Sequence, residues 1–86
     1  MKSLTTPDFW QLYIDLPPKI KKQARKSYQL WIENQSHPSL HFKKISGNLW
    51  SVRVSRNYRA LALKIDEDFS WFWIGSHDEY EELLKS

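Results

Sequence analysis

The sequence contains no cysteine, and it has only two glycines among its 86 residues. Without cysteine there is no disulfide and no thiolate metal site. The two glycines, Gly47 and Gly75, are too few to build a glycine-rich phosphate loop. The three histidines show no metal-ligand spacing with cysteine or paired carboxylates. We therefore expect no metal and no cofactor, and chemistry that depends on neither a nucleotide nor a thiol.

Long apolar runs are also missing. No uninterrupted apolar stretch approaches the roughly 20 residues that a membrane-spanning helix needs. The first eight residues, MKSLTTPD, lack the apolar segment of a secretory signal. These two absences predict a cytoplasmic protein that has no membrane partner.

Aromatic residues, by contrast, are abundant. Five Trp, four Tyr and four Phe make up 15% of the sequence, and hydrophobic residues make up 41%. A disordered chain is poor in such residues, so this chain is expected to fold. Its length allows a single domain, spanning residues 1–86, in which aromatic side chains supply much of the volume of a small core.

Charge is distributed unevenly along the chain. Residues 1–64 contain twelve of the thirteen Lys and Arg and three acids, a net charge of +9. Residues 65–86 contain one Lys and seven acids, a net charge of −6. A small domain polarised in this way attracts a polyanion to one part of its surface. The pI of about 9.3 agrees with a nucleic-acid partner, although a solvated surface explains the same charges equally well.

Two helices are predicted in the first half of the chain. Thr6-Pro7-Asp8 combines an N-cap, a first-turn proline and an acid near the helix N-terminus, and apolar residues then recur at helical spacing as far as Leu16. Pro17-Pro18 ends this helix and begins the next, because proline is tolerated in a first turn but not in a helix interior. The second helix runs from Lys19 to about Asn34. The short link predicts a helix hairpin.

Beyond residue 38 the hydrophobic period changes to two. Strands are predicted where apolar and polar residues alternate or where a short run is continuously apolar, namely 40–45, 50–55, 58–65 and 69–74. The last of these reads as a central strand covered on both faces. A short helix over 77–85 ends the chain, and residues 1–5 are a candidate edge strand.

These elements predict an α+β fold. Tight turns between consecutive strands make the neighbours antiparallel. The helices and the sheet each need to bury an apolar side, so they pack on each other. We expect an N-terminal helix hairpin on one face of a twisted antiparallel sheet of three to four strands, followed by a short C-terminal helix.

A group of polar residues on neighbouring strands and turns is the candidate for chemistry. Arg53 lies on the polar side of its strand and Arg59 begins the next one, so the hairpin should bring the two arginines together. His77 and Tyr80 follow the last strand. Arginine presents fixed N–H donors to phosphate oxygens, and His and Tyr can move a proton. Together they could bind a phosphodiester and transfer a proton.

Each of these residues also has an ordinary structural explanation. Arg53 can simply face water, and Arg59 can pair with an acid at 66–68 or 78–82. His77 is well placed to cap the last helix or to occupy its first turn, and Tyr80 can pack its ring on the sheet. Spacing alone therefore leaves both explanations open.

Two segments carry a resemblance to a known family. The run Leu49–Leu61, LWSVRVSRNYRAL, resembles the hallmark of the RelE/ParE toxin superfamily, in which an aromatic-x-x-basic strand is followed by a turn and a Tyr-Arg strand. The ending Ile74–Glu81, IGSHDEYE, is similar to the His-x-x-Tyr ending of many members. The helix hairpin and the His37-Pro38-Ser39-Leu40 link also resemble the family, so the resemblance covers nearly the whole chain.

The resemblance implies the toxin of a prokaryotic type II toxin–antitoxin module, with a cognate antitoxin as its partner. Many members resemble microbial ribonucleases and cleave mRNA, usually on the ribosome and without a metal. The RNA 2′-hydroxyl attacks the adjacent phosphate and the 5′-oxygen leaves. Carried onto this sequence, the catalytic residues are Arg53, Arg59, His77 and Tyr80, and the RNA-binding residues are Lys43, Lys44 and Arg56.

The family leaves alternatives open. One branch inhibits DNA gyrase without cutting RNA, and a third possibility is an inactive remnant that binds RNA or protein. His77 stands where several cleaving members have arginine. No carboxylate stands clearly at the position that some members use as general base, so the sequence does not assign the base.

Overall fold

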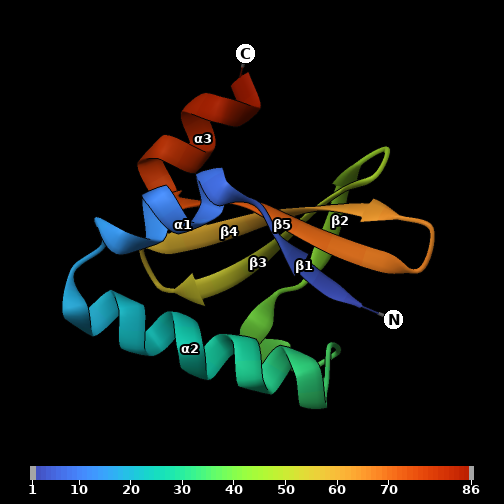
Figure 1. The fold of residues 1–86 in the computed structure, drawn as a ribbon, viewed down its shortest axis with the longest axis horizontal. Coiled ribbons are helices and arrows are strands. Elements are labelled where there is room, and N and C mark those ends of the chain that lie inside the picture. Colours follow the sequence, from blue (N-terminus) through green and yellow to red (C-terminus); the bar gives the residue numbers. More distant parts are fainter. Residues whose placement is uncertain (1, 86) are drawn as a thin grey trace.

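The computed structural model describes residues 2–85 as an α+β fold of five strands, three helices and one short 3₁₀ helix (Figure 1). In chain order the elements are β1 Ser3–Thr5, α1 Pro7–Ile14, α2 Pro18–Glu33, η1 Pro38–Leu40, β2 Lys43–Ser46, β3 Leu49–Ser55, β4 Tyr58–Ile65, β5 Asp68–Ser76 and α3 His77–Lys85. None of the helices within these residues has the length and apolar character needed to cross a bilayer.

The five strands form one mixed sheet in the order β1-β5-β4-β3-β2. Strands β2 to β5 are an antiparallel meander, as predicted, but β1 lies parallel to β5, with Leu4 opposite Ser70. The sheet therefore has five strands rather than the expected three to four, and the fifth is the candidate edge strand of residues 1–5, confirmed over Ser3–Thr5. Ser3, Leu4 and Thr5 are too few to show a clear pattern, and they form a strand because β5, at the other end of the sequence, pairs with them. Met1 of the candidate edge strand lies outside the described residues.

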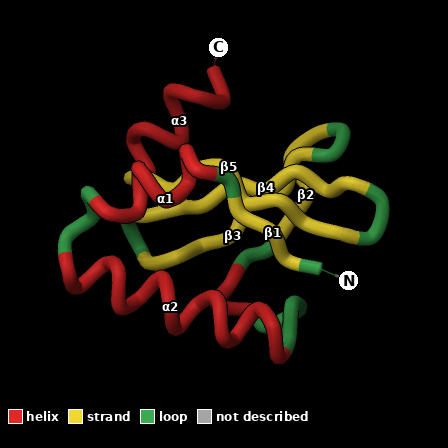
Figure 2. The backbone as a smooth tube through the Cα atoms, in the orientation of Figure 1, coloured by secondary structure: helices red, strands yellow, loops and turns green. Residues whose placement is uncertain are grey.

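Helices α1 and α2 pack on the face of the sheet that carries Trp71, and α3 contacts Ser51 on the other face; Figures 1 and 2 show α2 and α3 on opposite sides of the sheet. The N-cap of α1 is the predicted one, because Thr6 Oγ1 accepts a hydrogen bond from the backbone N–H of Phe9 at 3.2 Å. Helix α1 ends at Ile14 rather than Leu16, since the prolines that follow disfavour helical backbone in the link. Tyr13 joins the two helices by accepting a hydrogen bond from Arg25 Nη1 at 2.9 Å.

An aromatic cluster fills the core between α1, α2 and the sheet. Trp31 of α2 is 1% exposed, and it meets Phe42, Phe69 and Trp71 edge-on with ring centroids 5.2–5.6 Å apart. Edge-to-face packing of this kind adds to the free energy gained by burying the rings. Helices α1 and α2 are thus fixed on the face of the sheet that carries Trp71. They do not cover the opposite face of the sheet.

A bulge in β5 determines which side chains point to that opposite face. Ala62 of β4 pairs with Trp71 while Leu61 pairs with Trp73, so Phe72 is the extra residue. Because of it Trp71 faces the core and Trp73 faces away. The Trp73 ring lies over Gly75, where an added Cβ would be only 2.6 Å from its Cζ2 atom. Strand β4 alternates regularly, so Arg59 and Leu61 also face away from α1 and α2.

The link from α2 to β2 differs from the prediction. A strand was expected from residue 40, but Pro38–Leu40 form the 3₁₀ helix η1, and β2 begins at Lys43. Leu40 is buried in the core, and His41 ends η1 in the left-handed region with φ of +45°. This turn brings His41 round to the face of the sheet opposite α1 and α2.

Candidate active site

A polar cleft of about 360 Å³ lies on the face of the sheet opposite α1 and α2, between β2, β3, β4 and α3. It is lined by His41, Lys43, Ile45, Ser51, Arg53, Arg59, His77, Tyr80, Glu81 and Leu84. The cleft thus combines cations, two imidazoles, a phenol and one carboxylate. All four residues predicted to be catalytic are among its lining residues.

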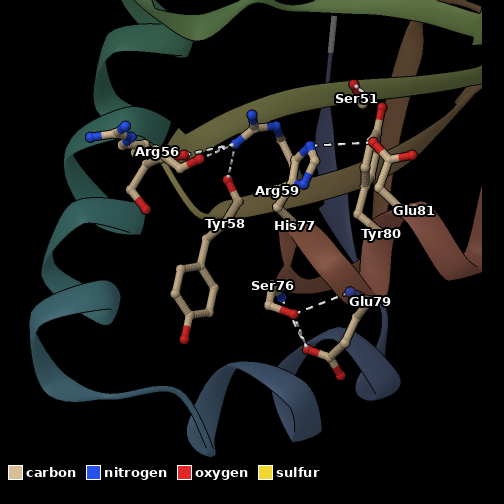
Figure 3. A network of polar contacts seen from close by, with 10 residues as sticks. Ser51, Arg56, Tyr58, Arg59, Ser76, His77, Glu79, Tyr80 and Glu81 are labelled. Carbon is tan, nitrogen blue, oxygen red and sulfur yellow. Dashed lines mark hydrogen bonds and ion pairs between the residues drawn. The ribbon is translucent and has the colours of Figure 1, made fainter.

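Arg53 and Arg59 are direct partners across β3 and β4. The hairpin therefore brings them together, as the sequence predicts. The guanidinium of Arg59 is held by the β3–β4 turn, because its Nη1 donates to the backbone carbonyl oxygens of Ser55 at 2.7 Å, Tyr58 at 2.9 Å and Arg56 at 3.3 Å (Figure 3). These bonds to the backbone, rather than an ion pair with an acid, fix the side chain at the cleft.

The paired arginines repel each other. Burial and the neighbouring charge of Arg53 lower the pKa of the Arg59 guanidinium from its ordinary value. Like charges directly opposite each other on adjacent strands destabilise a sheet. An anion placed against both side chains offsets this repulsion, and a phosphodiester suits their forked donors. The pair therefore has the electrostatics of an anion-binding site.

Helix α3 begins with a capping box. Ser76 Oγ accepts a hydrogen bond from the backbone N–H of Glu79 at 3.2 Å, and Glu79 Oε1 accepts from the backbone N–H of Ser76 at 3.0 Å (Figure 3). Ser76 is thus the cap, and His77 occupies the first turn. The His77 imidazole points into the cleft, where its Nε2 lies 3.3 Å from Glu81 Oε1.

Tyr80 anchors α3 to the sheet. The side chain is 7% exposed, and its hydroxyl donates to Ser51 Oγ at 3.4 Å. Ser51 is itself 2% exposed on β3. The ring of Tyr80 lies beside that of His77, with centroids 5.9 Å apart. In the structure Tyr80 therefore positions α3 and His77, and its own hydroxyl is engaged within the protein.

Five lining residues were not among the predicted site residues, and two of these five, His41 and Glu81, have side chains that can bind or release a proton. His41 lies at the edge of the cleft, and its Nε2 is 3.4 Å from Arg53 Nη1. A guanidinium can only donate, so this imidazole nitrogen is the acceptor. Glu81 is the second. The four-residue spacing of His77 and Glu81 was a usable signal in the sequence, whereas His41 depends on the turn after η1.

A sequence profile of the ParE-like toxin domain matches residues 18–82, which is most of the chain. The chain belongs to this family. The resemblance to the RelE/ParE superfamily, drawn from short motifs, is therefore confirmed. No protein with a curated description matches the sequence.

Solved structures of toxins share the fold of this ParE-like domain. RelE in the RelB–RelE antitoxin–toxin complex from Methanococcus jannaschii superposes with a TM-score of 0.74 at 17% identity, covering 93% of this chain and 96% of that one. The YoeB/ParE toxin from Agrobacterium tumefaciens gives 0.67 at 13%, covering 90% and 99%. The isolated E. coli RelE toxin gives 0.63 at 16%, covering 96% and 94%. At such identities the likeness concerns the fold.

Of the three residues predicted to bind RNA, one reaches the cleft of the ParE-like domain. Lys43 lies opposite Ser51 and lines the cleft. Lys44 lies opposite Trp50, on the core side of the sheet. Arg56 is in the β3–β4 turn, and it contributes its backbone carbonyl to Arg59 rather than its side chain to the lining.

Among residues 2–85 no three His, Asp or Glu side chains gather into a metal-binding group.

Proposed function

We propose that this ParE-like domain is a metal-independent endoribonuclease, the toxin of a type II toxin–antitoxin module, that cleaves mRNA on the ribosome in the prokaryotic cytoplasm. The observation that carries the proposal is the cleft, in which Arg53 and Arg59 lie opposite each other with His41 and His77 beside them. Two cations, of which Arg59 is held by the β3–β4 turn, and two imidazoles supply what phosphodiester cleavage by a 2′-hydroxyl requires: stabilisation of a phosphorane, a base and an acid.

The contacts of the two imidazoles support a division of their roles. His41 Nε2 faces a donor, Arg53 Nη1, so it carries a lone pair. His77 Nε2 faces the Glu81 carboxylate, an acceptor, so this contact is made when Nε2 carries a proton. We assign His41 as the general base and His77 as the general acid. Arg53 turns from His41 to the phosphate when RNA binds, which frees the lone pair.

The reaction then balances without a metal. His41 takes the proton of the 2′-hydroxyl while the 2′-oxygen bonds to phosphorus. The bond from phosphorus to the 5′-oxygen breaks, and His77 gives its proton to that oxygen. The products are a 2′,3′-cyclic phosphate and a 5′-hydroxyl end. Arg53 and Arg59 contact the phosphorane, which carries more negative charge than the substrate. Lys43 and the basic 1–64 segment attract the RNA backbone.

Expression of the domain without its partner is expected to arrest bacterial growth and translation. The test is to map transcript 5′ ends after induction and to compare them with ends from cells that express an Arg53→Ala/Arg59→Ala double variant at the same soluble level. New ends that carry a 5′-hydroxyl, present only with the wild type, support the nuclease. Normal growth at confirmed soluble expression contradicts the proposal.

A second candidate function is inhibition of DNA gyrase, and the match to a ParE-like profile favours it. It requires no cleavage chemistry, so it leaves the two histidines unexplained. A supercoiling assay with purified gyrase separates the two functions. Growth arrest with unchanged transcript ends, together with loss of supercoiling by gyrase, would show that the protein inhibits gyrase rather than cleaving RNA.

A cognate antitoxin is the proposed protein partner. An apolar groove of about 570 Å³ lies between α1, α2 and the sheet, on the face opposite the polar cleft. Trp10 and Tyr28 line it with half of their surface or slightly less exposed. Helix α2 beside it carries five basic residues, Lys19, Lys21, Lys22, Arg25 and Lys26. We propose that an amphipathic antitoxin helix with acidic flanks occupies the groove. Two structural relatives are RelB–RelE complexes.

Trp10→Ala is expected to weaken antitoxin binding about 30-fold, the factor that corresponds to a typical hot spot of about 2 kcal/mol. The reason is that Trp10, 51% exposed, is a large aromatic anchor at the groove. The measurement is calorimetric titration with the product of the neighbouring reading frame. Ile65→Ala is the control, since Ile65 is 57% exposed but lies at the far end of β4. Equal weakening by both variants, or no binding at micromolar concentration by the wild type, contradicts this docking site.

A further inference from the structure

The acids of α3 have different contacts. Glu79 accepts hydrogen bonds from the backbone N–H and the hydroxyl of Ser76 and so belongs to the cap. Glu82 lies 3.7 Å from Lys85 Nζ, on an exposed part of the helix. Glu81 lines the polar cleft, 3.3 Å from His77 Nε2 (Figure 3). One carboxylate of α3 is therefore placed among the groups proposed to handle phosphate.

The position of Glu81 is electrostatically unusual. Burial and Arg53 lower the pKa of Arg59, and Tyr80 and the carboxylate of Glu81 act in the opposite direction. The negative charge of Glu81 thus partly compensates the cations while the cleft contains no substrate. The same negative charge repels an approaching phosphate. The carboxylate and a phosphate oxygen also compete for the same hydrogen-bond donor, Nε2 of His77.

We infer that Glu81 is a resident anion of the cleft, whose carboxylate holds His77 in the free protein and is replaced there by the phosphate of bound RNA. This inference rests on the proposed nuclease function. It assigns Glu81 a role in substrate affinity: the residue stabilises the empty cation cluster and lowers affinity for phosphate. Binding then requires an exchange of one anion for another at His77.

The test compares Glu81→Gln with Glu82→Gln, which removes the same charge one residue further along the same helix. The probe is an RNA octamer with 2′-O-methyl groups, which cannot be cleaved because the attacking hydroxyl is blocked. We expect Glu81→Gln to bind it about fivefold more tightly at low ionic strength, the factor for one unit-charge repulsion at about 4 Å in water. Glu82→Gln should change the affinity less than about twofold, as screening between exposed charges requires.

A second measurement localises the effect. Inorganic phosphate added to the wild type should shift the NMR signals of the His77 ring, and Glu81→Gln should show the same shift at a lower phosphate concentration. Glu82→Gln should titrate like the wild type. Circular dichroism confirms that both variants retain the fold, as expected for exposed helical positions.

The outcomes separate this inference from the proposed function. Unchanged or weaker RNA binding by Glu81→Gln, or equal gains in both variants, overturns the resident-anion role even if the wild type cleaves RNA. Tighter binding by Glu81→Gln alone supports the role even if the wild type cleaves nothing, in which case only the nuclease proposal fails. Absence of RNA binding by all three proteins overturns both.

Discussion

Arg59→Ala is expected to lower the rate constant for RNA cleavage by about 10²–10³-fold, the typical effect of losing one donor to a developing oxyanion. The physical reason is that the phosphorane carries more negative charge than the substrate. A cation fixed against it therefore lowers the energy of the transition state more than that of the bound substrate. The β3–β4 turn fixes this guanidinium through the carbonyls of Ser55 and Tyr58, so the donor needs no rearrangement when charge develops.

The same contacts predict an effect on stability. Arg59→Ala removes charge-assisted hydrogen bonds to the turn, and such bonds contribute roughly 1.5–3 kcal/mol. For a domain of this size each 1 kcal/mol shifts the melting temperature by about 4–8 °C. The rate must therefore be measured well below the melting temperature and corrected for the folded fraction.

Two further variants separate catalysis from folding. Arg59→Lys keeps the charge but loses the forked geometry, so it should regain part of the stability and little of the rate. Arg53→Ala should weaken RNA binding as well as turnover, and it should not lower the melting temperature, because it removes the repulsion between the paired arginines. Cleavage at the wild-type rate by a less stable Arg59→Ala protein would show that Arg59 is structural.

Much of the fold follows from local patterns. The cap at Thr6, the two prolines at 17 and 18, and the alternation in β3 and β4 specify their elements independently of the rest of the chain. Strand β1 depends on more than local pattern, because the candidate edge strand Ser3-Leu4-Thr5 is completed by its parallel pairing with β5. The bulge at Phe72 is equally non-local, since it is defined by the register of β5 against β4.

The residues of the candidate site likewise include some that local sequence patterns predict and one that they do not. The pairing of Arg53 with Arg59 was predictable, because a short turn fixes the register of a hairpin. Glu81 could have been found from its spacing to His77. His41 could not, because its place at the cleft depends on the 3₁₀ turn before it and on its left-handed backbone. A non-glycine residue held in that region marks a position where function deserves a test.

The pH dependence of cleavage should identify the base and the acid separately. A base–acid pair gives a bell-shaped profile, in which the acid limb reports loss of the base and the alkaline limb reports loss of the acid. We expect His41→Asn to lower the rate of cleavage about 10²–10⁴-fold and to abolish the acid limb of the profile. We expect His77→Ala to lower the rate by a similar factor and to abolish the alkaline limb. Asparagine is chosen at position 41 because it tolerates the left-handed backbone.

Two controls make this result specific to the cleft. His37→Asn should retain the wild-type profile, since His37 caps η1 through a hydrogen bond from Ser39 that asparagine can also accept. Added imidazole should restore part of the activity of the His41 variant, which a purely structural histidine would not allow. If His41→Asn keeps both limbs and Glu81→Gln loses the acid limb, the base is Glu81. The proton of the 2′-hydroxyl then goes to a carboxylate on α3 rather than to the His41 imidazole between η1 and β2.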